Sequence, residues 1–422
     1  MTDRISSVEV AVGDKRISFE TGRLAKQASG AVVVRSGDTM VLVTAVVANT
    51  ERNVDFFPLT VDVEEGMYAA GKIPGGFIKK EGRPSDQAIL NARLIDRPIR
   101  PLWPKGFNRE THIVATVLSV DKTNPYDVLA LVGASAALTL SEAPFLGPVG
   151  GVRVAKVDGS WVVNPTYEEI DASPVNLVVA GTAEAITMVE AGCREVSEAD
   201  IIAGLEVAHE AIKKQVEVLR RWAEEVGRPK MEFEEKLPDR LLMDKIKARF
   251  AAEIEEASTI LDKLERANAI AALKQQVLDT WPPADDAEDP LEEAARLAKA
   301  FDAVEKETVR RLIAVEKKRP DGRAADEIRP VSCEVHVAPR VHGSGLFTRG
   351  QTQVLTLLTL GAARDEQRLD GLDPEESKRF MHHYKFPPFS VGETGFMRGP
   401  SRREIGHGAL AERALVPVIP DE

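Results

Sequence analysis

The chain contains an internal repeat, and this feature restricts the possible folds more than any other. Residues 29–42 align with residues 342–355 at an offset of 313, with five identical positions: Gly30, Gly37, Thr39, Val41 and Leu42. At an offset of 316, the first-copy residues Pro84, Ser85, Arg97 and Pro101 match Pro400, Ser401, Arg413 and Pro417. Self-similarity of this kind indicates that one structural unit occurs twice. We therefore expect two copies of one domain.

Local patterns indicate the class of this domain. Apolar and β-branched residues at 31–35 and 39–47 flank a short polar turn, which predicts a β-hairpin. Residues 112–120 and 175–180 predict further strands. Apolar residues three and four apart predict an amphipathic helix over 197–226. The expected fold class is α+β.

A helical segment separates the two copies. Residues 237–315 are rich in Ala, Glu, Leu and Lys, with one break between Pro282 and Pro290, and this predicts a solvated helical spacer. The second copy reaches only the equivalent of about Phe107, so we expect the chain to be a fragment with an incomplete second domain. The expected domains are 1–228, 236–316 and 319–422.

The charge distribution is more informative than the formal net charge of −12. Between residues 72 and 109, three acidic residues stand against nine basic ones: Lys72, Lys79, Lys80, Arg83, Arg93, Arg97, Arg100, Lys105 and Arg109. Phe77, Trp103 and Phe107 lie among them. Cations with aromatic rings suit single-stranded nucleic acid. A solvated loop followed by a charged helix face explains the pattern as well, so charge leaves both interpretations open.

Composition also bears on compartment. No run approaches the ~20 apolar residues that a membrane span requires, so no membrane association is expected. The two cysteines, Cys193 and Cys333, are far apart and lack a CxxC partner. A disulfide framework is therefore not expected. We expect a reducing, cytoplasmic location.

The repeat places candidate site residues after two helix starts. Ser85 is a predicted N-cap, and Arg93 and Arg97 share one face of the helix that follows. Guanidinium groups there could grip successive phosphates, although pairing with acids such as Asp96 is an equal alternative.

The equivalent segment of the second copy carries Arg402, Arg403 and His407. Two arginines could stabilise a transferring phosphoryl group, and the histidine could handle a proton. A surface turn with incidental charge is the alternative. No carboxylate cluster in a catalytic context is visible, so no metal ligand is predicted.

These motifs resemble the bacterial polynucleotide phosphorylase (polyribonucleotide nucleotidyltransferase) family over essentially the whole chain. The matching segments are 30–39, 61–68, 82–102, 319–323, 342–352, 386–395 and 402–408. The resemblance implies two ribonuclease PH-like domains, 1–228 and 319–422, around an all-helical domain, 236–316. It also implies a homotrimeric ring with a central channel for single-stranded RNA.

The resemblance assigns roles to individual residues. Phe77, Ile78, Lys79 and Lys80 fall on the family's channel-constriction loop, which is usually Phe-Phe-Arg-Arg. The implied RNA-binding residues are Phe77, Lys79, Lys80, Arg83, Arg93, Arg97 and Arg100. Arg402, Arg403 and His407 match the family's active-site segment and are the expected catalytic residues. The family's Mg²⁺ ligands and phosphate-binding serines would lie beyond Glu422, so Mg²⁺ is expected without ligands in this chain.

The activity that the resemblance implies is 3′-to-5′ phosphorolysis of single-stranded RNA, including mRNA. Inorganic phosphate is the co-substrate, nucleoside 5′-diphosphates are released, and the reverse reaction polymerises RNA without a template. The resemblance also suggests partners in an RNA-degradation complex, and the fragment alone is expected to be inactive. Two alternatives stay open: a non-catalytic RNA-binding or ring-scaffold protein, and a hydrolytic, exosome-like relative.

Overall fold

The structure is a computed structural model that describes residues 5–54, 56–283 and 289–420. It consists of two compact units. One unit contains Met1–Glu235 together with Ala362–Glu422, and the other contains Lys236–Gly361.

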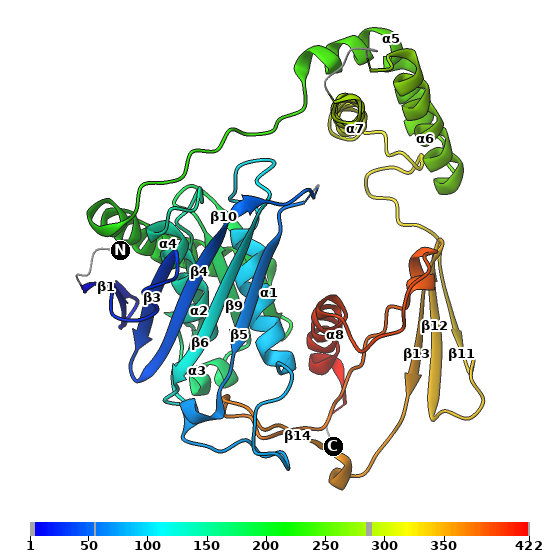
Figure 1. Ribbon diagram of the computed structural model, residues 1–422. Helices are drawn as coiled ribbons and strands as arrows, with labels where there is room; N and C mark the ends of the chain where they lie inside the picture. The colour runs from blue at the N-terminus through cyan, green and yellow to red at the C-terminus, as the bar shows by residue number, and fades with distance from the viewer. Residues whose placement is uncertain (1–4, 55, 284–288, 421–422) are drawn as a thin grey trace. The chain divides into compact units, whose positions relative to one another are not determined.

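The first unit contains two main sheets (Figure 1). The six-stranded sheet has the order β1-β2-β3-β4-β6-β5, and only β5 and β6 pair in parallel. Its strands are β1 (Ser6–Val12), β2 (Lys15–Thr21), β3 (Gly30–Ser36), β4 (Thr39–Glu51), β5 (Leu59–Glu64) and β6 (Arg109–Ser119). The antiparallel second sheet, of order β10-β9-β7-β8, contains β7 (Gly150–Val157), β8 (Ser160–Val163), β9 (Val175–Gly181) and β10 (Ile186–Cys193). The predicted hairpin is confirmed as β3–β4, and the other predicted strands are confirmed within β6 and β9.

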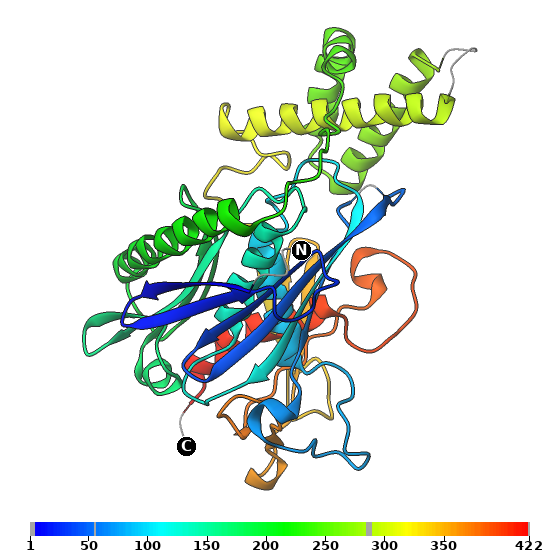
Figure 2. The same ribbon diagram turned by 60° about the vertical axis from the view of Figure 1, so that its left-hand side comes forward.

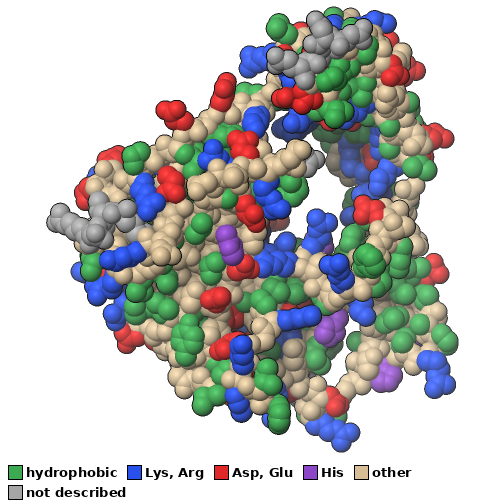
Figure 3. All heavy atoms as spheres, in the orientation of Figure 1, with side chains coloured by type: hydrophobic (Ala, Val, Ile, Leu, Met, Phe, Trp, Pro, Cys, Tyr) green, Lys and Arg blue, Asp and Glu red, His purple; other side chains and the backbone are tan. Residues whose placement is uncertain are grey.

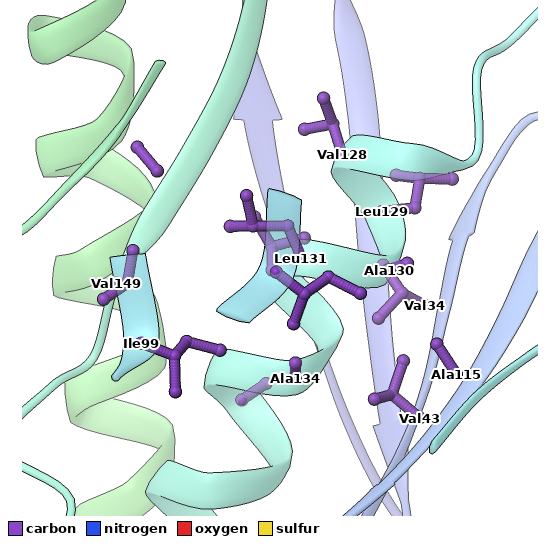
Figure 4. Close-up of a cluster of buried hydrophobic side chains, with 14 of the residues drawn as sticks. Val34, Val43, Ile99, Ala115, Val128, Leu129, Ala130, Leu131, Ala134 and Val149 are labelled. Atoms are coloured by element: carbon purple, nitrogen blue, oxygen red, sulfur yellow. The ribbon is translucent and has the colours of Figure 1, made fainter. Parts of the chain in front are cut away.

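The helix α2 (Asp127–Leu140) forms the centre of this unit, and all of its residues are buried. It packs against β3 and β4 on one side and towards β7 and α4 on another. Figure 4 shows the side chains of Val34 and Val43 beside those of α2. A Cβ atom on Gly133 would lie 2.6 Å from Val43 Cγ2, so glycine permits this close approach of helix and sheet.

The other helices of this unit surround the sheets. They are α1 (Asp86–Ile99), α3 (Tyr167–Ala172), α4 (Glu198–Val226) and α8 (Arg402–Leu415). The predicted amphipathic helix is confirmed as α4, whose N-cap Ser197 accepts a hydrogen bond from the Asp200 amide. Its apolar face packs on β1, β7 and β9, and Figure 2 shows it lying along the strands.

The second unit contains the predicted helical segment. Its helices are α5 (Arg240–Ser258), α6 (Lys263–Thr280) and α7 (Pro290–Ala314), and their core includes Phe250 and Phe301. Most of the predicted break between Pro282 and Pro290 lies outside the described residues. A three-stranded antiparallel sheet, β11 (Val331–Val335), β12 (Gly343–Arg349) and β13 (Thr352–Leu358), belongs to the same unit. Within the described part of the chain, no helix is long and apolar enough to span a membrane.

The internal repeat is reproduced element by element. The hairpin β3–β4 recurs as β12–β13 at the offset of 313, and α1 recurs as α8 at the offset of 316. A 3₁₀ turn before each helix, η1 (Met67–Ala70) and η3 (Pro388–Val391), ends at a left-handed glycine, Gly71 or Gly392. The two-copy α+β fold with an intervening helical domain is confirmed, whereas the domain boundaries stay a prediction.

Candidate phosphoryl-transfer and RNA-binding site

The N-terminus of α8 carries two of the predicted catalytic residues. Ser401 caps the helix by accepting a hydrogen bond from the Glu404 amide, and the Glu404 carboxylate accepts one from the Ser401 amide. Arg402 and Arg403 follow as the first two helical residues. Cations are unfavourable at this positive end of the helix dipole. The two arginines therefore do not serve helix stability, and their position suits an anionic ligand.

Arg402 is held by strand β5. Its Nη1 donates to the Val61 carbonyl at 2.5 Å, and its Nη2 pairs with Asp62 Oδ1. The other Asp62 oxygen, Oδ2, lies 2.8 Å from His112 Nε2 on β6. Partial burial tends to raise the pKa of Asp62, but hydrogen bonds from Arg402 and His112 outweigh it and hold the pKa below its ordinary value. Asp62 is therefore a carboxylate at neutral pH, and Arg402 is paired within the chain.

Arg403 and His407 lie one helical turn apart and are both exposed. Within the part of the chain that the structure describes, Arg403 makes no hydrogen bond or ion pair. The ring of His407 stands edge-on to that of Tyr384, with 5.3 Å between centroids. This face of α8 thus presents one available guanidinium and one imidazole.

The helix α1 brings the predicted RNA-binding arginines next to α8. Arg93 is half-buried and packs closely on Gly406 of α8. A Cβ atom added to Gly406 would lie only 2.4 Å from Arg93 Nε. Arg97 donates to Glu190 at 2.7 Å and to the Val189 carbonyl at 3.1 Å. Arg413 also donates to Glu190, at 2.5 Å. Repeat-equivalent arginines from the two copies therefore share one carboxylate.

Arg100 is engaged differently. It forms an ion pair with Asp96 at 2.7 Å and donates to the carbonyls of Phe57 and Leu59, each at 3.0 Å. The intramolecular pairing with Asp96, which the sequence offers as the alternative to phosphate binding, is therefore present, and it involves Arg100. Figure 3 shows basic and acidic side chains interspersed on the face that carries α1 and α8.

The glycine-rich loop between η1 and α1 projects its side chains into solvent. Phe77 is fully exposed at 101%, and Ile78 is 74% exposed. Lys79 has a left-handed backbone, φ 51°, and Lys80 is exposed. Arg83, also exposed, lies near Gly399, which belongs to the loop that leads into α8. A free ring beside two ammonium groups can contact bases and phosphates together.

The described residues were expected to contain no magnesium ligands, and they offer no clustered set of metal-binding side chains. Among residues 5–54, 56–283 and 289–420, no group of three or more His, Cys, Asp and Glu side chains could hold a metal ion. We therefore assign no chemical step to a metal in this chain.

The structure also shows partners that the sequence did not predict. Besides Asp62 and Glu190, a partly buried hydrogen bond joins the copies: Tyr167 donates to Asp373 Oδ1 at 2.5 Å. Burial raises the pKa of Asp373 to about 6, although the hydrogen bond from Tyr167 acts to lower it. No local sequence pattern pointed to Asp62, Glu190 or Asp373.

Comparison with known proteins defines the class to which this fold and site belong. Profiles described as "3' exoribonuclease family, domain 1" and "domain 2" match residues 13–144 with 327–422, and residues 147–211, respectively. The chain belongs to the 3′ exoribonuclease family.

Within that class, the helical segment and several similar proteins carry the same family name. Residues 241–324 match "Polyribonucleotide nucleotidyltransferase, RNA binding domain". Proteins named polyribonucleotide nucleotidyltransferase are similar: that of Geobacillus kaustophilus is 55% identical over 99% of this chain and 57% of its own length. Those of Heliobacterium modesticaldum and Halothermothrix orenii are 53% and 51% identical, each over 99% of this chain and 58% and 59% of their own lengths. The chain thus spans less than two thirds of these relatives, and the resemblance drawn from the sequence is confirmed.

Proposed function

We propose that this chain provides the RNA-binding path and part of the phosphoryl-transfer site of a phosphorolytic 3′-to-5′ exoribonuclease. The observation that carries the proposal is the pair of arginines at the positive end of α8, where Arg403 has no partner among the described residues. The relatives' name, polyribonucleotide nucleotidyltransferase, supports RNA as substrate.

The proposed reaction needs no covalent enzyme intermediate. An oxygen of inorganic phosphate attacks the phosphorus of the last phosphodiester, and the bond from that phosphorus to the 3′ oxygen of the preceding nucleotide breaks. The products are a nucleoside 5′-diphosphate and an RNA shortened by one residue, whose 3′ oxygen gains a proton. Arg403 would stabilise the charge that develops on the transferring group, and His407 would hold or supply that proton. Because the bonds exchanged are similar in energy, the reverse polymerisation should also occur.

RNA would approach along the exposed loop and α1. Lys79, Lys80 and Arg83 would contact phosphates without reading sequence, and Phe77 would stack on a base. Arg93 and Arg97 would continue this path to α8, and Arg100 near the end of α1 would extend it. A homotrimeric ring, a Mg²⁺ requirement, a cytoplasmic location and RNA-degradation partners belong to the same proposal. The two free thiols, Cys193 and Cys333, are consistent with a reducing compartment.

The test uses a chimera in which this chain replaces the matching part of the Geobacillus kaustophilus relative. The chimera is incubated with a single-stranded RNA, with and without inorganic phosphate, and the released nucleotides are identified. We expect nucleoside 5′-diphosphates whose release depends on phosphate. Monophosphates formed without phosphate would favour the hydrolytic alternative, and RNA binding without products would favour the scaffold. The 422-residue chain, assayed alongside, is expected to release no nucleotides.

A further inference from the structure

We propose that Asp62, on the first copy of the repeat, is a positioning residue for the proposed catalytic helix of the second copy. By holding Arg402, it fixes the orientation in which α8 presents Arg403 and His407. The inference rests on the proposed function and divides the arginine pair: Arg403 contacts the transferring group, and Arg402 acts as an anchor.

The contacts of Arg402 support an anchoring role. Both terminal nitrogens of its guanidinium are engaged, one by the Val61 carbonyl and the other by the Asp62 carboxylate. The strand that provides these acceptors, β5, lies at the edge of its sheet, and its carbonyl is therefore free to accept from a side chain. A guanidinium with two bonds to one strand has a defined direction.

Asp62 is itself fixed in place. One carboxylate oxygen binds Arg402, and the other lies 2.8 Å from Nε2 of His112, which comes from the neighbouring strand. The carboxylate is about two thirds buried, with 33% of its side chain exposed, so its pairing is screened less than a fully exposed pair. Asp62 therefore offers a rigid contact point for the start of α8.

The far end of α8 is held in a similar way. Arg413 donates to Glu190 at 2.5 Å, and Glu190 also belongs to the first copy. The helix is thus tied to the first copy near both ends, and the face with Arg403 and His407 lies between the ties. Loss of the tie at Asp62 would let the first turn of α8 rotate, and small displacements of a charge-stabilising group reduce a rate strongly.

The experiment compares Asp62→Ala, Asp62→Asn and Glu64→Ala in the chimera described above. Glu64 is on the same strand with the same charge and binds Thr116 rather than α8, so it is the matched control. Asp62→Ala should lower kcat roughly tenfold with the KM for RNA unchanged, because positioning acts on the transition state. Asp62→Asn retains an acceptor oxygen and should recover most of the rate, and Glu64→Ala should behave as the parent.

Double substitutions separate anchoring from a general effect of charge. Asp62→Ala should add no further loss to Arg402→Ala, since both remove one interaction, but its loss should multiply with that of Arg403→Ala. The inference is overturned if Asp62→Ala changes only the KM for RNA, if it leaves kcat unchanged, or if Asp62→Asn is as slow as Asp62→Ala.

A second measurement does not depend on activity. Hydrogen exchange at the amides of residues 404–407, which are hydrogen-bonded, should accelerate in Asp62→Ala, while exchange in α1 should not. Unchanged exchange in α8 would overturn the inference even if the chimera performs phosphorolysis. If the unsubstituted chimera shows no phosphorolysis, the proposed function fails, and exchange alone then decides whether Asp62 anchors α8.

Discussion

The helices α1 and α8 are copies of one element with different chemistry at their starts. Each has 14 residues, and each begins after a serine N-cap, Ser85 or Ser401. The first two helical residues are Asp86 and Gln87 in α1, and they are Arg402 and Arg403 in α8. An acid complements the positive end of a helix dipole, and a cation opposes it.

This difference separates structural from functional demands. The start of α1 is explained by helix stability alone, whereas the start of α8 is not. In α8 the capping box of Ser401 and Glu404 offsets part of the unfavourable charge. The same helix of the repeat therefore serves the fold in α1 and presents cations in α8.

The copies also differ in how their hairpins are covered. In the first copy, α2 buries one face of β3–β4, and Val41 and Val43 are fully buried. At the offset of 313, the equivalent positions of the second hairpin are Val354, which is 48% exposed, and Thr356, which is also exposed. Among the residues that the structure describes, no helix covers that hairpin as α2 covers the first.

The largest expected effect tests whether catalysis belongs to the second copy. In the chimera, Arg403→Ala should lower kcat by roughly 10²–10³ while the affinity for RNA is retained, because charge develops on the phosphoryl group only during the reaction. Gln87→Ala, at the repeat-equivalent position of α1, should leave kcat within about twofold. Steady-state kinetics with varied RNA and phosphate measure both.

Arg403→Lys adds a conservative control. A lysine retains the charge but lacks the bidentate fork, so it should restore the rate only in part. Equal effects of Arg403→Ala and Gln87→Ala would remove the functional distinction between the two helix starts.

The next effect compares the loops that precede the two helices. Both begin at a left-handed glycine and expose a phenylalanine followed by a cation: Phe77 with Lys79, and Phe396 with Arg398. Replacing Lys79 and Lys80 with alanine should weaken RNA binding roughly tenfold and flatten the log–log salt dependence by ~0.7 for each lost phosphate contact. Arg398→Ala should change neither, because Arg398 lies over Phe396 at 5.9 Å. Measurements of RNA affinity at several salt concentrations check this. Equal log–log slopes in all variants would show that RNA does not contact Lys79 and Lys80.

The third effect concerns the partly buried hydrogen bond between Tyr167 and Asp373, which joins the two copies. The pKa of Asp373 rises from 3.8 to about 6 on folding, so the folded state binds its proton more tightly than the unfolded state. Stability should therefore fall as pH rises from about 4 to about 6. Asp373→Asn removes that penalty and can still accept from Tyr167. At pH 7.5 it should stabilise the chain by about 2 kcal/mol or less, and the gain should shrink at pH 4.5.

Urea unfolding midpoints of both proteins at the two pH values measure this gain. Glu375→Gln, which removes an exposed charge in the same segment, should shift neither midpoint appreciably. A gain for Asp373→Asn that is equal at both pH values would show that the carboxyl is not protonated on folding.

Elements with a local signal could be predicted from the sequence. The hairpins, the helix starts at Ser85 and Ser401, and α4 all follow from caps, turns or apolar periodicity. The helix α2 could not be predicted in this way, because burial on every side leaves no polar face and hence no period.

The same distinction applies to the candidate site. The repeat placed Arg402, Arg403 and His407 on one helix, and the basic segment placed Arg93 and Arg97 on another. Their partners depend on tertiary structure: Asp62 and Arg402 are 340 residues apart in the chain. No spacing rule connects such distant positions. The sequence therefore could not show which arginines pair with carboxylates of the chain and which are available to RNA.

The smallest expected effect compares the two N-caps. Ser85 Oγ accepts from the Ala88 amide at 2.9 Å and donates to Glu65 at 2.6 Å, whereas Ser401 accepts from the Glu404 amide at 3.2 Å within a capping box. Either alanine substitution should cost about 1 kcal/mol of local stability. Ser85→Ala should cost the more, because a carboxylate also loses a donor.

Aspartate at the same positions sharpens the contrast. Ser401→Asp should restore α8, since aspartate is a good N-cap and Arg402 and Arg403 lie beside it. Ser85→Asp should not restore α1, because the new carboxylate would stand against Glu65, which also accepts from Tyr126 at 2.7 Å. Hydrogen exchange at the amides of Ala88 and Glu404 reports the two caps separately. If both aspartates restored their helices equally, Glu65 would not repel a carboxylate at position 85, and the two N-caps would be energetically equivalent.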